Sequence, residues 1–381
     1  MKMTALHHKK LVLTTAALIY LASLSACNED TTTPADPPDT PTPEEITIEG
    51  VGQHGIFDPS LAHDPETGLL WMSYSEVEDS QMWPDQNVAV QTRLAWSDDA
   101  GDTWTDTGSL INPAEDLALP LDPPNNAGTW EQEVPALIHD PGAPADERWK
   151  LIWMRYLQIN HSPAYMHGWL ALKTAPGPAG PWSAERKLFA ALGYDAVNDA
   201  TIGPPEVFVN TLDPELSATV IVAEPGILAT DSALYVTMLA AEAEPGGGKI
   251  ALLKWPHPAG PWQYLGSFLT NADDAPQFGF EGFSAPELFN QNGATYLIVT
   301  PQNNDSYQGT MVFEVTDLET ATLRRAEGVP TLALEFYGTD GTHNGAAGYH
   351  EQATGSGLIY SEVDTSEQPL FFRIFKSGQT P

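Results

Sequence analysis

A hairpin pattern that recurs five times constrains the fold of this chain more than any other feature. Its first copy runs from Phe57 to Tyr74, with a short strand, a Pro- and Gly-containing turn and a second strand. The second strand, Leu69 to Tyr74, carries bulky residues suited to a half-buried pleated surface. Looser copies begin at Val134, Glu224, Ala285 and His343.

The repeats predict an all-β fold, because further strand-like runs follow each copy and no long segment has helical periodicity. Five four-stranded units arranged radially make a five-bladed β-propeller. The last unit is one strand short, and we expect residues 46–51 to supply that strand and close the ring. Small residues near the start of each copy suit strands that converge on an axis; they are Ser60, Ala136, Gly226, Ala285 and Gly345.

The segment from Ser97 to Trp104 matches the Asp box, S-x-D-x-G-x-T-W, which occurs in sialidases and other propellers. We interpret it as a structural turn in which Asp99 caps the backbone and Trp104 packs in the blade. A sialidase would also need an arginine triad for the substrate carboxylate. Arginines are scarce in this chain, so the box indicates a fold and no chemistry.

The charge of the chain excludes two classes of partner. Its 51 acidic residues against 16 basic ones give a formal net charge of -35 at pH 7. Such a chain is repelled by nucleic acid and by anionic membrane surfaces. The acidity is typical of a solvated surface, and calcium binding by part of it is the alternative.

The first 27 residues are expected to be a targeting signal. A basic start precedes an apolar run that ends in LSAC at Cys27, which resembles the lipobox of bacterial lipoproteins. The resemblance implies that Cys27 is lipidated and that the protein is anchored in the cell envelope; a secretory signal with a chance cysteine is the alternative. Cys27 is the only cysteine, so no disulfide can form within the chain. Residues 28–45 are expected to be a disordered tether, and 46–381 the propeller.

The heads of the repeats resemble those of glycoside hydrolase family 43 and the related arabinanase, levansucrase and invertase propellers. Asp58-Pro59 resembles the Asp-Pro of the first blade, which implies that Asp58 is the general base. Glu224-Pro225 takes the place of a third-blade aspartate, which implies that Glu224 tunes a neighbouring pKa. The resemblance also implies a monomeric, inverting glycosidase.

In the fourth blade the family carries its general acid in a Glu-Gly-Pro motif. The nearest match is Glu281-Gly282, with the proline displaced to Pro286, and Glu287 is a rival for the acid. His343 resembles a fifth-blade histidine that supports a metal ion or waters on the axis, which implies a possible Ca²⁺ site there. Glu133 is a substitute for the aspartate that the second blade lacks.

Glycoside hydrolysis needs two carboxyl groups facing each other across the scissile bond. Carboxylates at the inner ends of different blades meet that need across an axial funnel. Aromatic rings also stack on sugars, and we expect Trp83, Trp130 and Trp169 to bind substrate. The sequence thus predicts an extracytoplasmic hydrolase of poly- or oligosaccharides; the alternative is a non-catalytic propeller lipoprotein that binds glycan or protein.

Overall fold

The fold is seen in a computed structural model, which describes residues 42–79, 88–110, 116–118, 128–159, 162–192, 204–244, 246–304, 306–338, 343–364 and 370–381. The predicted signal segment, Cys27 and most of the predicted tether lie outside the described residues. Among the residues that are described, no helix has the length and apolar character needed to cross a membrane.

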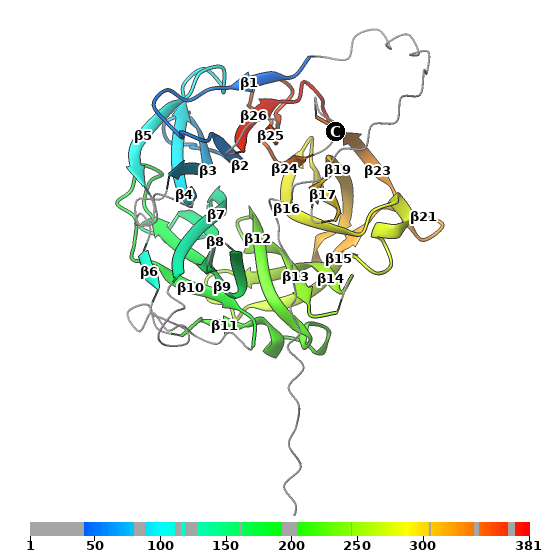
Figure 1. The fold of residues 1–381 in the computed structure, drawn as a ribbon. Coiled ribbons are helices and arrows are strands. Elements are labelled where there is room, and N and C mark those ends of the chain that lie inside the picture. The colour runs from blue at the N-terminus through cyan, green and yellow to red at the C-terminus, as the bar shows by residue number, and fades with distance from the viewer. Residues whose placement is uncertain are drawn as a thin grey trace, which may run out of the picture.

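Five sheets, antiparallel except where β11 pairs with β10, form a five-bladed β-propeller, which confirms the predicted fold class (Figure 1). Blade 1 is β2 (Ile56–His63), β3 (Leu70–Asp79), β4 (Val88–Ser97) and β5 (Thr105–Leu110). Blade 2 is β7 (Gly128–His139), β8 (Trp149–Ile159), β9 (Ser162–Ala175) and β10 (Arg186–Ala190), with β6 (Asp116–Ala118) and β11 (Val207–Phe208) at its edges. Blade 3 is β12 (Thr219–Ala229), β13 (Ala233–Glu242), β14 (Gly248–Pro256) and β15 (Gln263–Thr270).

Blade 4 is built on β16 (Gly282–Gln291), β17 (Ala294–Asn303) and β19 (Thr310–Asp317). Its edge strands are β20 (Thr322–Leu323) and β23 (Leu332–Phe336), and β18 (Ser306–Tyr307) pairs with β17. A separate two-stranded ribbon joins β21 (Arg325–Ala326) to β22 (Val329–Pro330). Four short 3-10 helices complete the assigned elements: η1 (Val209–Thr211), η2 (Pro214–Leu216), η3 (Ala275–Phe278) and η4 (Leu318–Thr320).

Blade 5 closes the ring with a strand from the other end of the described chain. It contains β24 (Asn344–Tyr349), β25 (Leu358–Asp364) and β26 (Phe371–Lys376), and β1 (Glu44–Ile46) pairs antiparallel with β26. The closing strand therefore comes from the expected end of the chain, but it spans Glu44–Ile46 and shares only Ile46 with the predicted residues 46–51. Ile48, within the predicted range, instead forms a bridge to Trp104 of blade 1.

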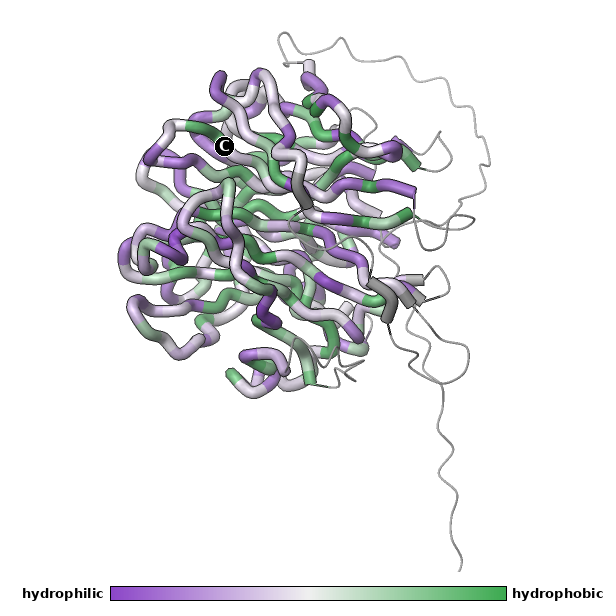
Figure 2. The backbone as a smooth tube through the Cα atoms, turned by 90° about the vertical axis from the view of Figure 1, so that its left-hand side faces the viewer, coloured by the Kyte–Doolittle hydropathy of each residue, from purple (hydrophilic) through white to green (hydrophobic). Residues whose placement is uncertain are grey.

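The hydrophobic core lies between the blades. All six buried clusters found in the described residues join two neighbouring blades, and the cluster between blades 2 and 3 includes Ile152, Leu170 and Val236. Figure 2 shows hydrophobic stretches along the strands inside the molecule and much of the hydrophilic chain in turns at the surface. Because each sheet buries both faces, a blade is stable only with neighbours on both sides.

The Asp box forms the structural turn that the sequence predicts. Asp99 accepts hydrogen bonds from the Thr103 N–H at 2.8 Å and from the Thr103 hydroxyl at 2.6 Å. These bonds lower the pKa of Asp99 to about 2. Gly101 has a φ of 91°, and Trp104 is buried.

Candidate active site

The innermost strand of every blade carries a β-bulge, and the five bulges surround the axis. Strands β2, β7, β12, β16 and β24 ring the centre of the molecule in Figure 1. In each case the pairing register shifts where two residues of the inner strand oppose one residue of its partner, and the first of the two has a positive φ. These first residues are Asp58 (54°), Val134 (52°), Glu224 (52°), Ala285 (42°) and Ala346 (47°).

The bulges explain why Asp58 and Glu224 occupy equivalent places in blades 1 and 3. A bulge turns a side chain away from the regular alternation of a strand, and bulges are common beside active sites. Proline follows the first residue in four of the five bulges. Since proline has no N–H, it adds no unpaired donor where the ladder is interrupted.

Small residues follow the bulges where the strands crowd together. A Cβ on Gly226 would lie 2.1 Å from the Pro286 carbonyl oxygen, and one on Gly348 would lie 2.4 Å from that of Pro59. The predicted small residues Ser60, Ala136 and Gly226 do follow the bulges of blades 1, 2 and 3. In blade 4 the predicted Ala285 is itself the first residue of the bulge, and Glu287 follows the bulge. In blade 5, however, the equivalent residue is Gly348 and not Gly345, because the bulge lies three residues later than the sequence suggested.

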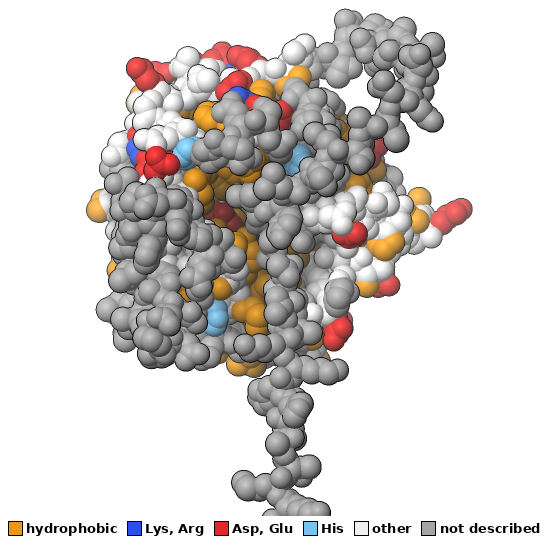
Figure 3. All heavy atoms as spheres, viewed as in Figure 1, with side chains coloured by type: hydrophobic (Ala, Val, Ile, Leu, Met, Phe, Trp, Pro, Cys, Tyr) orange, Lys and Arg blue, Asp and Glu red, His pale blue; other side chains and the backbone are white. Residues whose placement is uncertain are grey.

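A small cavity of about 20 Å³ lies between the bulges, lined by residues of all five blades, Asp58, Val134 and Glu287 among them. A volume of this size holds about one water molecule. Figure 3 shows acidic atoms deep in a hollow near the middle of one face, with hydrophobic side chains around them.

Asp58 is buried at the head of blade 1, with 4% of its surface exposed. The Ser75 hydroxyl donates to Asp58 Oδ2 at 3.0 Å, and the Asp58 N–H donates to Ser361 Oγ at 2.8 Å. Burial raises the pKa of Asp58 to about 8, and the negative charge of Glu224 contributes to the rise. The Ser75 hydroxyl and the Val134 N–H act in the opposite direction.

Glu133 precedes the bulge of blade 2 and is 6% exposed. The Tyr156 hydroxyl donates to Glu133 Oε2 at 3.3 Å. Burial raises the pKa of Glu133 well above its ordinary value, and the charges of Asp58 and Glu224 raise it further. The Tyr156 hydroxyl is the one donor that opposes this rise, against three negative neighbours, of which Glu131 is the third.

Glu224 is held by donors on both of its carboxyl oxygens. The Tyr307 hydroxyl donates to Oε1 at 2.7 Å, and the Ala285 N–H donates to Oε2 at 2.8 Å. Burial raises the pKa of Glu224, and these two donors, with the Ser284 hydroxyl, oppose the rise. Glu224 is thus better supplied with donors than Glu133.

Three carboxyl groups from three different blades therefore interact electrostatically at the axis. Asp58 and Glu224 are brought together as the sequence predicted, and Glu133 is a full member of the group. Neighbouring carboxyl groups cannot all ionise at neutral pH, so one or more keeps a proton. One protonated and one ionised carboxyl group is the pair that acid–base cleavage of a glycosidic bond requires.

Glu281 is not part of this group. Its side chain is exposed, and Glu281 Oε2 accepts a hydrogen bond from the Asn304 N–H at 2.8 Å. The bulge of blade 4 consists of Ala285 and Pro286, so the proline of the family's Glu-Gly-Pro motif corresponds to Pro286. Ser284, fully buried beside Glu224, then stands where the motif has its glutamate. The sequence match to Glu281 was wrong because it followed the Glu-Gly letters and not the proline of the bulge.

Glu287 lies in the axial cavity, below the bulge of its own blade. It is 8% exposed, and the Ser60 hydroxyl donates to Glu287 Oε1 at 3.3 Å. Burial raises the pKa of Glu287 to about 8, against the opposing effect of the Ser60 hydroxyl and the Ile227 N–H.

His343 lies at the start of blade 5, where its Nδ1 and the Ser306 hydroxyl are 2.8 Å apart. In the described part of the chain, no three His, Cys, Asp or Glu side chains are arranged to hold a metal ion. We derive no step through a metal.

Two of the three tryptophans that the sequence predicts to bind substrate are buried inside blade 2. Trp130 is 3% exposed and Trp169 is fully buried, and their ring centroids are 4.8 Å apart inside blade 2. A buried ring has no free face for a sugar, so these two residues stabilise the blade. Trp83 lies outside the described residues.

The sequence did not predict that two tyrosines donate hydrogen bonds to the axial carboxyl groups, although Tyr156 is among the aromatic residues whose position suggests sugar binding. Tyr156 lies on the second strand of blade 2, and its ring packs on that of Tyr165 at 4.8 Å. Tyr307 lies on the short strand β18, outside the recurring hairpins. No local sequence pattern indicates either hydrogen bond: Tyr156 contacts Glu133 across two strands of blade 2, and Tyr307 contacts Glu224 of the neighbouring blade.

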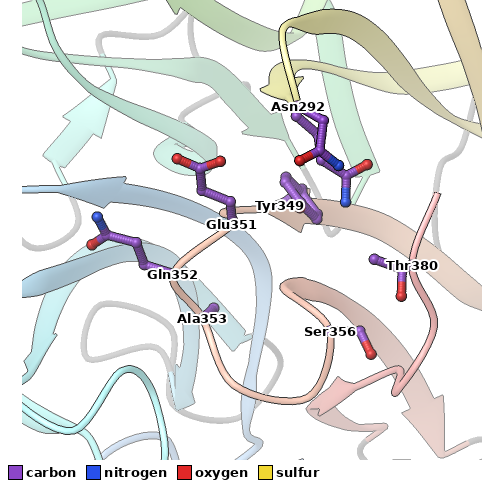
Figure 4. Close-up of a pocket in the computed structure, with 8 residues that line it drawn as sticks. Asn292, Tyr349, Glu351, Gln352, Ala353, Ser356 and Thr380 are labelled. Carbon is purple, nitrogen blue, oxygen red and sulfur yellow. The ribbon is translucent and has the colours of Figure 1, made fainter.

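A second and larger hollow, of about 400 Å³, lies away from the carboxyl groups (Figure 4). It is formed by Asn292 after β16, by the loop after β24 that carries Glu351 and Gln352, and by Thr380. None of the predicted site residues lines it.

Strand pairing and site together define a five-bladed propeller with an axial group of carboxylates. No protein-family model and no curated protein sequence matches the chain. Among solved structures, it is similar to a thermostable family-43 glycoside hydrolase, with 15% identity over 86% of this chain and 90% of that chain and a TM-score of 0.48. A family 117 glycoside hydrolase of the marine bacterium Zobellia galactanivorans has 13% identity over 88% and 89%, with a TM-score of 0.48. An arabinanase of Bacillus subtilis has 13% identity over 86% and 95%, with a TM-score of 0.44. Likenesses of this size transfer no activity or residue role to this chain.

Proposed function

We propose that this chain is an extracytoplasmic glycoside hydrolase that acts on a poly- or oligosaccharide. The observation that carries the proposal is the meeting of three buried carboxyl groups, from Asp58, Glu133 and Glu224, at the axis of the propeller. Lipid anchoring through Cys27 in the envelope of a bacterium is part of the same proposal and rests on the sequence alone.

The surroundings of the three groups suggest their roles. Asp58 has two donors and one strong negative neighbour, whereas Glu133 has one long hydrogen bond and two such neighbours. The negative charge is therefore more stable on Asp58, which becomes the general base that activates water. Glu133 keeps its proton and becomes the general acid that protonates the leaving oxygen. Glu224 supplies the charge that holds the proton on Glu133.

Hydrolysis of aryl arabinosides, xylosides and galactosides tests the proposal, with wild type compared against Asp58→Asn. We expect the substitution to lower kcat by about 100- to 10,000-fold, because general base catalysis contributes that much. Asp98→Asn is the matched control, since Asp98 is exposed in the Asp box turn. Unchanged hydrolysis by the Asp58 variant, with both proteins folded by circular dichroism, would remove Asp58 from the mechanism.

Burial of the site favours a second candidate, a propeller that binds glycan or protein without cleaving it. The three carboxyl residues are each less than 9% exposed, and the cavity beside Asp58 is far smaller than a sugar-binding pocket. A glycan that raises the melting temperature while no aryl glycoside is hydrolysed would favour this candidate.

A further inference from the structure

A short hairpin crosses from blade 4 to the axial carboxyl groups. Strand β18 pairs with the end of β17 through Gln302↔Tyr307 and Asn303↔Ser306. The Gln308 N–H donates to the Pro301 carbonyl oxygen at 2.9 Å, and this bond extends the pairing of the two strands by one residue on each side. This hairpin lies outside the five recurring hairpins and is an addition to blade 4.

The hairpin contacts the blades on both sides. Tyr307 reaches Glu224 of blade 3, with its hydroxyl 2.7 Å from Oε1. Ser306, on the same strand, reaches His343 of blade 5 at 2.8 Å. Two adjacent residues therefore tie three blades together at the level of the proposed active site.

Glu281 holds the base of this hairpin. The Glu281 N–H donates to the Gln302 carbonyl oxygen at 2.9 Å and lies 3.0 Å from Asn303 Oδ1. Glu281 Oε2 accepts from the Asn304 N–H at 2.8 Å. The residue that sequence matching selected as the acid thus binds the backbone of the segment that carries Tyr307.

We propose that Tyr307 is a positioning residue that fixes the carboxyl group of Glu224, and that Glu281 fixes the hairpin that carries Tyr307. The inference rests on the proposed function, in which Glu224 sets the charge around the acid. Tyr307 acts through Glu224, because its hydroxyl and the Ala285 N–H each hold one carboxyl oxygen.

The groups that face this contact come from four blades. Asp58 of blade 1, Glu133 of blade 2 and Glu224 of blade 3 all raise the pKa of Tyr307, after burial. Tyr307 therefore stays protonated and can only donate to Glu224. A donor to the ionised form lowers the pKa of a carboxyl group, so loss of the Tyr307 hydroxyl raises the pKa of Glu224.

Carboxyl-carbon NMR titration of protein labelled with ¹³C-glutamate tests this without requiring activity. Glu224→Gln and Glu133→Gln assign the two signals. In Tyr307→Phe we expect the titration midpoint of Glu224 to rise by about 1 to 2 pH units. Tyr156→Phe is the matched control, because it removes the tyrosine hydroxyl that donates to Glu133; we expect it to move the Glu133 signal and leave that of Glu224 in place.

Substitution of Glu281 tests the second half of the inference. Glu281→Ala should raise the Glu224 midpoint in the same direction as Tyr307→Phe, and by less. Glu281→Gln keeps an oxygen acceptor for the Asn304 N–H and should restore the wild-type midpoint. A Glu224 midpoint that is the same in wild type and Tyr307→Phe overturns the inference, and so does an equal shift in Tyr156→Phe.

Hydrolysis assays separate this inference from the proposed function. If wild type hydrolyses aryl glycosides, Tyr307→Phe should lower kcat about 10-fold or more, and Glu281→Gln should retain wild-type kcat. If wild type hydrolyses none of them, the proposed function fails, while a raised Glu224 midpoint still supports the positioning role of Tyr307.

Discussion

At the scale of single residues, Glu287 is a buried carboxyl group that the proposed reaction does not use. It lies in the axial cavity with a pKa raised to about 8 by burial. In the unfolded chain the pKa returns to its ordinary value near 4.5. Between these two values the folded protein keeps a proton that the unfolded chain releases. Rising pH therefore favours unfolding, and the stability that this carboxyl group contributes is lost from about pH 4.5 to pH 8.

Glu287→Gln should remove this pH dependence, because glutamine is neutral at every pH. We expect the free energy of unfolding of the variant, relative to wild type, to increase by on the order of 2–4 kcal/mol between pH 5 and pH 8. Urea unfolding at several pH values measures it. Glu335→Gln, at an exposed position, is the control and should show no such trend. Parallel pH curves for wild type and Glu287→Gln would show that the buried carboxyl does not carry the effect.

At the residue scale, the sequence indicates the position of a side chain best where that side chain belongs to the repeat itself. Asp58 and Glu224 were found because each precedes the proline of a bulge. Glu281 was selected because Glu281-Gly282 matches the first two residues of the family's Glu-Gly-Pro motif, whereas the proline of that motif corresponds to Pro286 in the bulge. Tyr307 could not be predicted, because its proposed role depends on its hydrogen bond to Glu224 of another blade, which no local sequence pattern indicates.

At the scale of elements, the five bulges hold non-glycine residues in the left-handed region of backbone conformation. Val134 is an unfavourable example, since it is β-branched and has a φ of 52°. Glycine adopts this conformation without the steric cost of about 1–2 kcal/mol that other residues incur. In ordinary strand positions the order is reversed, and glycine is less stable than alanine.

We therefore predict that Val134→Gly is more stable than Val134→Ala, by about 0.5–1 kcal/mol. Both variants keep the N–H that donates to Ser75 Oγ, so the comparison isolates backbone conformation. Ala62→Gly, at a regular position of β2, is the control and should lose stability. Chemical denaturation measures all three, and a lower stability for glycine than for alanine at position 134 would contradict the bulge geometry.

At the scale of the whole molecule, the ring is closed by β1 pairing with β26, and the core is divided among the interfaces between blades. The number of blades could be predicted from the sequence, because five hairpins of one pattern allow few other folds. The limits of the closing strand could not, because pairing with β26 across the ring, and no local pattern of residues, selects Glu44–Ile46. The carboxyl groups meet only because the ring closes, since they lie on three different blades.

The most direct test that these carboxyl groups act together is the hydrolysis of glycosides with different leaving groups by wild type and Glu133→Gln. Loss of the general acid should slow cleavage of aryl glycosides with poor leaving groups by about 100- to 10,000-fold. Glycosides of dinitrophenol, whose leaving group needs no proton, should be cleaved by the variant within about 10-fold of the wild-type rate. An equal loss for every leaving group, or none for any, would contradict the role of Glu133 as the acid across the axis from Asp58.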